Sequence, residues 1–92
     1  MESLVKCARC NGCYLHHGDI EIFDRKEDEE EGTHIKTNGD TVLINRAMAG
    51  NPSSRRDGIK IYCTCEYCDT ITTVIEIVQH KGQTFIRVKE AT

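Results

Sequence analysis

Two tight clusters of cysteines constrain this chain of 92 residues more than any other feature. The clusters are Cys7, Cys10 and Cys13 near one end and Cys63, Cys65 and Cys68 in the last third. Each contains a Cys-x-x-Cys pair, a spacing that lets one tight turn aim two thiolates at an ion about 2.3 Å away. Two such pairs make a tetrahedral four-thiolate site. The clustering therefore favours metal ligation, although six cysteines also leave three disulfides open as an alternative.

Six cysteines compete for four ligand positions. The C-terminal cluster holds only one Cys-x-x-Cys pair, whereas in the N-terminal cluster Cys10 can pair with either Cys7 or Cys13. We prefer Cys7, because Asn11-Gly12 then follows the turn, where a residue with positive φ is commonly required. The predicted ligands are therefore Cys7, Cys10, Cys65 and Cys68. Zn²⁺ suits them best, since it has no redox chemistry and accepts four thiolates without geometric penalty; iron is the alternative.

The remaining cysteines and the histidines have less definite roles. We expect Cys63, which shares a strand face with Ile59 and Ile61, to be a buried apolar thiol. Cys13 is a spare ligand, a core thiol or a redox-sensitive surface residue. A second metal bound by Cys13, His16 or His17, and Cys63 stays open. His16 and His17 are adjacent and alternate across a strand, so we expect one to be packed and the other solvated.

Two further polar segments are candidates for binding. His80 lies at a predicted hairpin turn, where a polar residue is ordinary. Arg55 and Arg56 belong to a flexible loop that could grip a phosphate or an acidic partner, but arginines on such a loop are usually solvated.

Apolar and polar residues alternate with a period of two over much of the chain, and no segment has the apolar stripe of an amphipathic helix. The turn signals Asn38-Gly39-Asp40 and Lys81-Gly82-Gln83 predict two hairpins. We expect loops at residues 24–32 and 49–58 and one helical turn at residues 46–48. The predicted strands are residues 20–23, 41–45, 59–63, 71–78 and 84–88, with another around Ile35. The expected fold is a small all-β antiparallel sheet that forms a single domain over residues 1–92.

The two cysteine pairs resemble a motif of a known protein family. Cys7-x-x-Cys10 and Cys65-x-x-Cys68, each beside a predicted hairpin, resemble the knuckles of the zinc-ribbon family. The resemblance implies an antiparallel sheet with zinc clamped between two hairpin turns. The whole chain is also similar to small uncharacterised bacterial or prophage proteins of the zinc-ribbon type, which implies nothing about activity.

The chain departs from the ribbon pattern in two ways. The interval between the pairs is 54 residues, whereas the compact pattern has roughly 15–20. The glycine usually found after the second cysteine of each knuckle is displaced to Gly12 in the first pair and replaced by Asp69-Thr70 in the second. The long interval implies a ribbon with a large β insertion between its knuckles.

Composition and charge limit the function. The net charge is −3, and residues 24–31 alone hold six acids and two bases, so the rest of the chain is nearly neutral. There is no basic excess of the kind that drives non-specific nucleic-acid binding. No apolar run reaches the roughly 20 residues of a membrane span. The first residues lack a basic stretch followed by an apolar segment, so we expect no secretory signal and a cytoplasmic location.

These observations predict a non-enzymatic zinc-binding module with one structural four-cysteine site. Catalytic zinc keeps a position open for water, whereas four thiolates close the shell, and no other catalytic motif or small-molecule site is evident. We expect an unknown protein partner. One alternative is a nucleic-acid-binding ribbon, in which Lys6, Arg9, Arg46, Arg55, Arg56 and Lys60 gather opposite the acidic loop. Another is a thiol-based redox or metal sensor.

Overall fold

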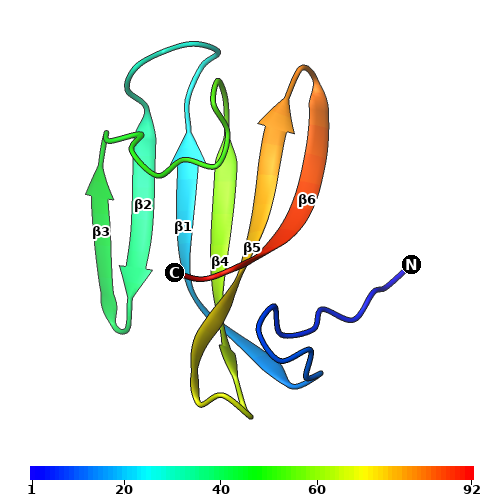
Figure 1. The fold of residues 1–92 in the computed structure, drawn as a ribbon. Helices are drawn as coiled ribbons and strands as arrows, with labels where there is room; N and C mark the ends of the chain where they lie inside the picture. The colour runs from blue at the N-terminus through cyan, green and yellow to red at the C-terminus, as the bar shows by residue number, and fades with distance from the viewer.

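The computed structural model describes residues 1–92 as six β-strands without a helix. No helix long and apolar enough to cross a membrane is present. The strands are β1 (Leu15–Asp24), β2 (Thr33–Asn38), β3 (Thr41–Asn45), β4 (Gly58–Cys65), β5 (Thr70–His80) and β6 (Gln83–Glu90). They form one open antiparallel sheet in the order β3-β2-β1-β4-β5-β6 (Figure 1). The predicted fold class is confirmed.

Two short turns set the register of the outer hairpins. In the β5–β6 turn, Lys81 and Gly82 both have positive φ, at 51° and 76°. Two such residues between paired strands match the right-handed strand twist of a hairpin. In the β2–β3 turn, Gly39 has φ of 62°. Both predicted hairpins are therefore confirmed, and they place β3 and β6 on opposite edges of the sheet.

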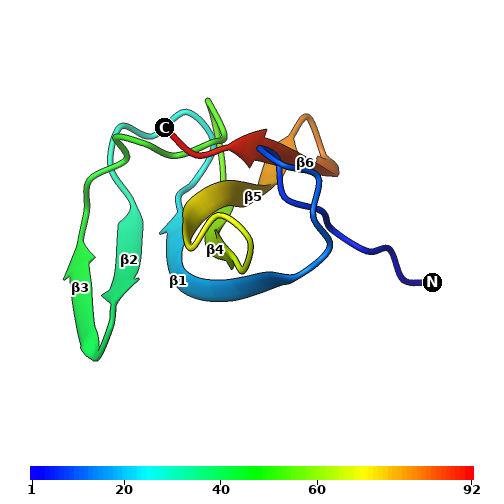
Figure 2. The same ribbon diagram turned by 60° about the horizontal axis from the view of Figure 1, so that its bottom comes forward.

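The chain order explains the long interval between the cysteine pairs. β1 starts just after the first pair, and β4 runs antiparallel beside it and ends at the second pair. The hairpin of β2 and β3 is inserted between them in sequence but lies to the side of β1 in space (Figure 1). The insertion therefore widens the sheet without separating the two cysteine pairs. Viewed from below, the sheet curls rather than lying flat (Figure 2).

One face of the sheet, which we call the covered face, lies under the loop of residues 46–57. It carries Glu21, Phe23 and Lys60, and Gly50 of the loop lies against the Phe23 ring and the Lys60 side chain. The Ser53 hydroxyl donates to the Gln79 carbonyl at 2.7 Å. The loop crosses in front of β2 and β1 before it enters β4 (Figure 1). This loop therefore covers the face near its upper end.

The core of the covered face is small and partly polar. The Phe23 ring stacks on His34 with centroids 4.4 Å apart. His34 Nε2 lies 2.8 Å from the Glu21 carboxylate, which also accepts a hydrogen bond from the Tyr62 hydroxyl. Only 13 of the 92 residues are buried. The apolar core is thus too thin to account for much stability by itself.

The predicted helical turn at residues 46–48 is wrong, because these residues have no regular structure. The Asn45 side-chain oxygen accepts a hydrogen bond from the Ala47 amide at 2.9 Å. A side chain that satisfies a nearby backbone amide offers the chain an alternative to the helical bond. The segment instead begins the loop over the covered face.

Candidate metal centre

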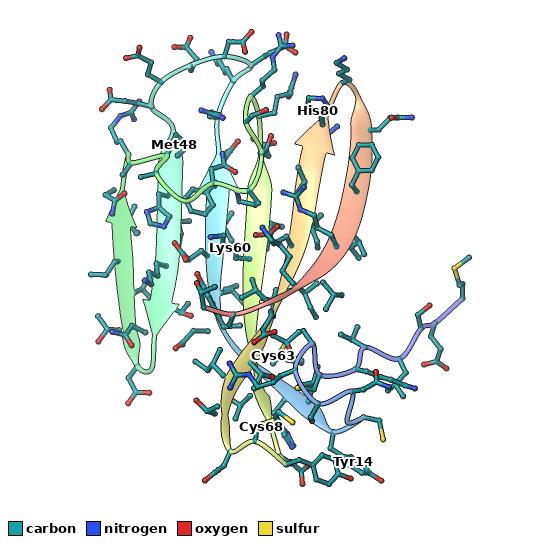
Figure 3. The ribbon with its side chains drawn as sticks, in the orientation of Figure 1. Tyr14, Met48, Lys60, Cys63, Cys68 and His80 are labelled. Carbon is teal, nitrogen blue, oxygen red and sulfur yellow. The ribbon has the colours of Figure 1, made fainter.

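The pairing of β1 with β4 brings the two cysteine clusters together. Leu15, two residues after the first cluster, lies opposite Cys65, and His17 lies opposite Cys63. The first knuckle (residues 7–11) therefore precedes β1 and the second (residues 65–69) follows β4 at the same end of the sheet. Figure 3 shows Cys63, Cys68 and Tyr14 at this end and Met48 and His80 at the other.

Four sulfur atoms converge between the knuckles. The Sγ atoms of Cys7, Cys10, Cys65 and Cys68 all lie within 4.8 Å of one another. Cys10 Sγ and Cys65 Sγ are 3.6 Å apart, close to the separation of about 3.8 Å that a tetrahedral ion with 2.3 Å bonds to sulfur requires. All six cysteines are free thiols rather than disulfides. The four cysteines predicted as ligands are thus the four that the fold gathers, and they could hold a metal ion.

The two knuckles have the same backbone geometry. The Asn11 amide donates to the Cys7 carbonyl at 2.9 Å, and the Asp69 amide donates to the Cys65 carbonyl at 2.8 Å. Asn11 and Asp69 have φ of 63° and 55°. Asn and Asp are the non-glycine residues that best tolerate this left-handed region. They take the place of the missing knuckle glycines, which explains the departure from the ribbon pattern.

The two halves of the cluster differ in exposure. Cys7 and Cys65 are 3% and 0% exposed, whereas Cys10 is exposed and Cys68 is half-buried. Each knuckle thus contributes its first cysteine to the interior and its second to the solvent side. The exposed edge gives an ion a route of entry from solvent.

Cys7 has the richest set of hydrogen-bonding neighbours. Its Sγ lies 3.0 Å from the Thr72 hydroxyl and accepts from the amides of Arg9 and Cys10 at 3.3 and 3.4 Å. The Thr73 hydroxyl accepts from the Ala8 amide at 2.9 Å, which ties the knuckle to β5. A β-bulge in the β4–β5 pairing falls at Thr72 and brings both threonine hydroxyls, 3.0 Å apart, to the knuckle.

Sequence reasoning missed these two threonines. Thr72 and Thr73 stand in a run of β-branched residues that reads as an ordinary strand, and no signal in that run marks a bulge.

The thiols influence one another strongly. Burial raises the pKa of Cys7, but hydrogen bonds from Thr72 and from the Cys10 and Arg9 amides outweigh it and lower the pKa to about 5. The Gly12 amide lowers the pKa of Cys10. Cys65, burial and Cys7 together raise this pKa by more, so it lies above its usual value. Burial and the neighbouring Cys10 and Cys65 raise the pKa of Cys68 to about 12. Four thiolates so close together need a cation, and this donor set fits a thiophilic metal ion.

Comparisons of the chain with protein-family models, with curated proteins and with solved structures found no match. Function is therefore inferred from the residues and geometry of this chain. That geometry is an all-β fold with four close cysteines, which is compatible with a zinc-ribbon-like site.

The other two cysteines lie outside the cluster. Cys63 is 1% exposed, and its burial raises the pKa of its thiol, as expected for a buried apolar thiol. Cys13 is exposed. The structure contains no second group of three or more close metal-binding side chains. The second metal site considered from Cys13, His16 or His17, and Cys63 is therefore not formed.

The expected histidine pattern is wrong in part. His16 and His17 are both exposed, so neither is the packed residue, and His16 Nε2 lies 2.6 Å from the Glu66 carboxylate. His80 ends β5 and is half-buried. The buried histidine is His34, which the sequence did not single out, since only the pairing of β2 with β1 places it beside Glu21.

Two of the six basic residues that could gather opposite the acidic loop, Arg55 and Arg46, lie beside that loop instead. Arg55 makes two hydrogen bonds of 2.7 Å to the carboxylate of Asp28, within that loop. This ion pair holds the pKa of Asp28 below its usual value. Arg46 Nε lies 3.9 Å from Glu31. Arg55 is thus committed to the acidic loop rather than free to bind a phosphate.

Proposed function

We propose that this chain is a zinc-binding module in which one Zn²⁺, held by Cys7, Cys10, Cys65 and Cys68, stabilises the fold. The single observation that carries the proposal is the convergence of four sulfur atoms from two knuckles 54 residues apart. Zinc is favoured over iron because a closed tetrahedral set of four thiolates imposes no penalty on a d¹⁰ ion. The metal supplies a cross-link between the N-terminal segment and the β4–β5 turn.

A structural role suits the energetics of this chain. A protein of this size has a net stability of roughly 0.05–0.15 kcal/mol per residue. Structural zinc contributes an apparent binding free energy of about 10–16 kcal/mol at neutral pH, which becomes folding free energy. Since only 13 residues are buried, we infer that the metal accounts for most of the net stability.

We propose a non-enzymatic role for the site. Catalytic zinc needs an open coordination position for water or substrate, and four cysteine ligands leave none. The buried Glu21–His34–Tyr62 network on the covered face has no nucleophile beside it, and each of these side chains is already hydrogen-bonded within the protein.

The role we propose is binding of a protein partner. β3 and β6 are exposed along their whole lengths, and each edge carries unpaired backbone groups that can pair with another strand. The nucleic-acid alternative has less support, because Arg55 and Arg46 face the acidic loop. A titration with DNA or RNA at low salt tests it: a steep salt dependence of binding would favour it, and no binding would exclude it.

Elemental analysis of the purified chain tests the identity and amount of the bound metal, and we expect one zinc ion per chain. Cadmium substitution followed by ¹¹³Cd–¹H correlation spectroscopy then identifies the ligands. Coupling to the β-protons of Cys7, Cys10, Cys65 and Cys68 is expected. Coupling to Cys13 or Cys63 instead would refute the proposed ligand set. Iron in place of zinc would refute zinc as the bound metal.

A further inference from the structure

Nine of the ten isoleucines lie on one face of the sheet, opposite the covered face. The first row crosses all six strands through successive register pairs: Ile44, Ile35, Ile22, Ile59, Ile77 and Ile86. The second row, two residues further along the strands, contains Val42, Thr37, Ile20, Ile61, Ile75 and Val88. We call the isoleucines and valines of these rows the isoleucine face.

Over its two rows this face has no second layer; beyond them, the first knuckle contacts Thr73 of the same face through the Ala8 amide. All six strands belong to one sheet, and the chain has no helix and no second sheet to pack against it. The loop of residues 46–57 lies on the other side, against Phe23 and Lys60. At the ends of the first row, Ile44 and Ile86 are each 70% exposed. Antiparallel sheets normally bury their apolar face against another layer, so the isoleucine face lacks the layer that would complete it.

The size of the face can be compared with what a dimer requires. Six strands spaced about 4.8 Å apart and two rows about 7 Å apart give a footprint of roughly 400 Å² once side-chain widths are included. Two such faces cover about 800 Å² in projection; the accessible area of their corrugated side chains is larger, and a standard specific interface buries roughly 1,200–2,000 Å². Polar residues on the same face lie beyond the two rows along the strands, Asp24 at the end of β1 and Glu90 at the end of β6, and form part of the rim that such interfaces have.

The chemistry of the face favours a second copy of the same chain as its occupant. No charged residue lies in either row, so the face offers nothing to select a charged partner. A two-fold axis in the plane of the interface pairs identical patches. Because the first row is isoleucine at every strand, with three strands on each side of its centre, it complements itself in such an arrangement.

We propose that the isoleucine face is the interface of a symmetric homodimer, in which two sheets pack face to face to form a β-sandwich. The dimer supplies the hydrophobic core that the single chain lacks. Two sheets packed in this way lie about 10 Å apart, with their side chains interdigitated.

Sedimentation equilibrium of the zinc-loaded chain tests the proposal, and the mass of two chains is expected at micromolar concentrations. Ile77 lies in the middle of the first row on β5. Ile77→Glu is expected to weaken association at least about 100-fold, because the interface would bury an unpaired charge. Leu43→Glu is the matched control, because Leu43 is 49% exposed and lies on the covered face at the β3 edge. The Leu43→Glu variant is expected to associate as strongly as the unchanged chain.

A second measurement does not depend on any variant. In a mixture of isotope-labelled and unlabelled chains, intermolecular NOEs between isoleucine methyl groups are expected. A monomer at all concentrations, a dimer that survives Ile77→Glu but not Leu43→Glu, or intermolecular NOEs only between β6 backbones would overturn the proposal. The zinc content of each sample is measured in parallel, so a failure of the proposed metal site is seen separately from a failure of the dimer.

Discussion

At the scale of single residues, the groups that surround the thiols matter as much as the thiols. Thr72 and Thr73 come from β5, far from the first knuckle in sequence, and they fix its position through Cys7 and Ala8. Neighbours of this kind orient metal ligands, and their loss typically costs about 10–100-fold in metal affinity.

Thr72→Val tests this directly. Valine keeps the shape of threonine but removes the hydroxyl that lies 3.0 Å from Cys7 Sγ. We expect the zinc affinity, measured by competition with a chromophoric chelator, to fall about tenfold. Thr41→Val, at an exposed edge position of β3, is the control and is expected to leave the affinity unchanged. An equal affinity for both variants would show that the Thr72 hydroxyl does not support the site.

The two cysteines outside the cluster are expected to react at different rates. Cys13 is exposed and Cys63 is 1% exposed. In the zinc-loaded protein, a small thiol reagent should therefore modify Cys13 quickly and Cys63 only on unfolding. We also expect modification of Cys13 to leave the zinc content unchanged. Zinc release on modification of Cys13 alone would instead support the metal- or redox-sensor alternative.

The buried Glu21 should make stability depend on pH. Burial raises the pKa of its carboxyl, but hydrogen bonds from Tyr62 and His34 and the charge of Lys36 lower it below its usual value of 4.5. Lys60 also lies opposite it on β4. A depressed pKa contributes stability above the unfolded value, and this contribution is lost as the pH falls through the folded value.

Glu21→Gln removes that contribution. We expect it to cost about 1–3 kcal/mol at neutral pH, measured by urea unfolding, and the difference from the unchanged chain to shrink as the pH falls below 4.5. Because both proteins lose zinc in acid, their difference cancels the effect of the metal. A difference that stays constant with pH would show that the ionised carboxylate is not what stabilises the fold.

At the scale of elements, much of the fold and of the site could be predicted. Period-two alternation and turn residues located the strands and both outer hairpins, because these signals are local. The Cys-x-x-Cys spacing likewise identified the four cysteines that the fold gathers. Their role as ligands stays a prediction.

What the sequence could not reveal depends on contacts between distant segments. The bulge at Thr72, the burial of His34 and the course of residues 46–57 over Phe23 follow from pairing and packing rather than from local pattern. The pairing of Arg55 with Asp28 is of the same kind.

The knuckles offer a test of local strain. Asp69 holds a φ of 55°, which glycine adopts without steric strain. We expect Asp69→Gly to stabilise the zinc-loaded protein by up to about 1 kcal/mol, whereas Asp69→Val destabilises it, because a β-branched side chain is poorly tolerated at positive φ. Thermal unfolding in excess zinc measures both effects. A loss of stability in Asp69→Gly would mean that the aspartate side chain stabilises the fold by more than the strain of its positive φ destabilises it.

At the scale of the whole molecule, the sheet has two unequal faces. One is covered by a loop and holds a small, partly polar core, and the other presents the isoleucines to its surroundings. The single chain therefore buries little apolar surface on either side. A metal cross-link at one end of the sheet compensates for this, because the binding free energy of a structural zinc ion is as large as the expected net stability.

The most direct test of this account is removal of the metal under reducing conditions at neutral pH. Strong chelator is added to the purified chain, and the amide NMR spectrum is recorded together with the metal content. We expect the chain to lose one zinc ion, its dispersed β-sheet resonances to collapse, and added zinc to restore them. A metal-free chain whose spectrum stays dispersed and unchanged would contradict a structural role for zinc.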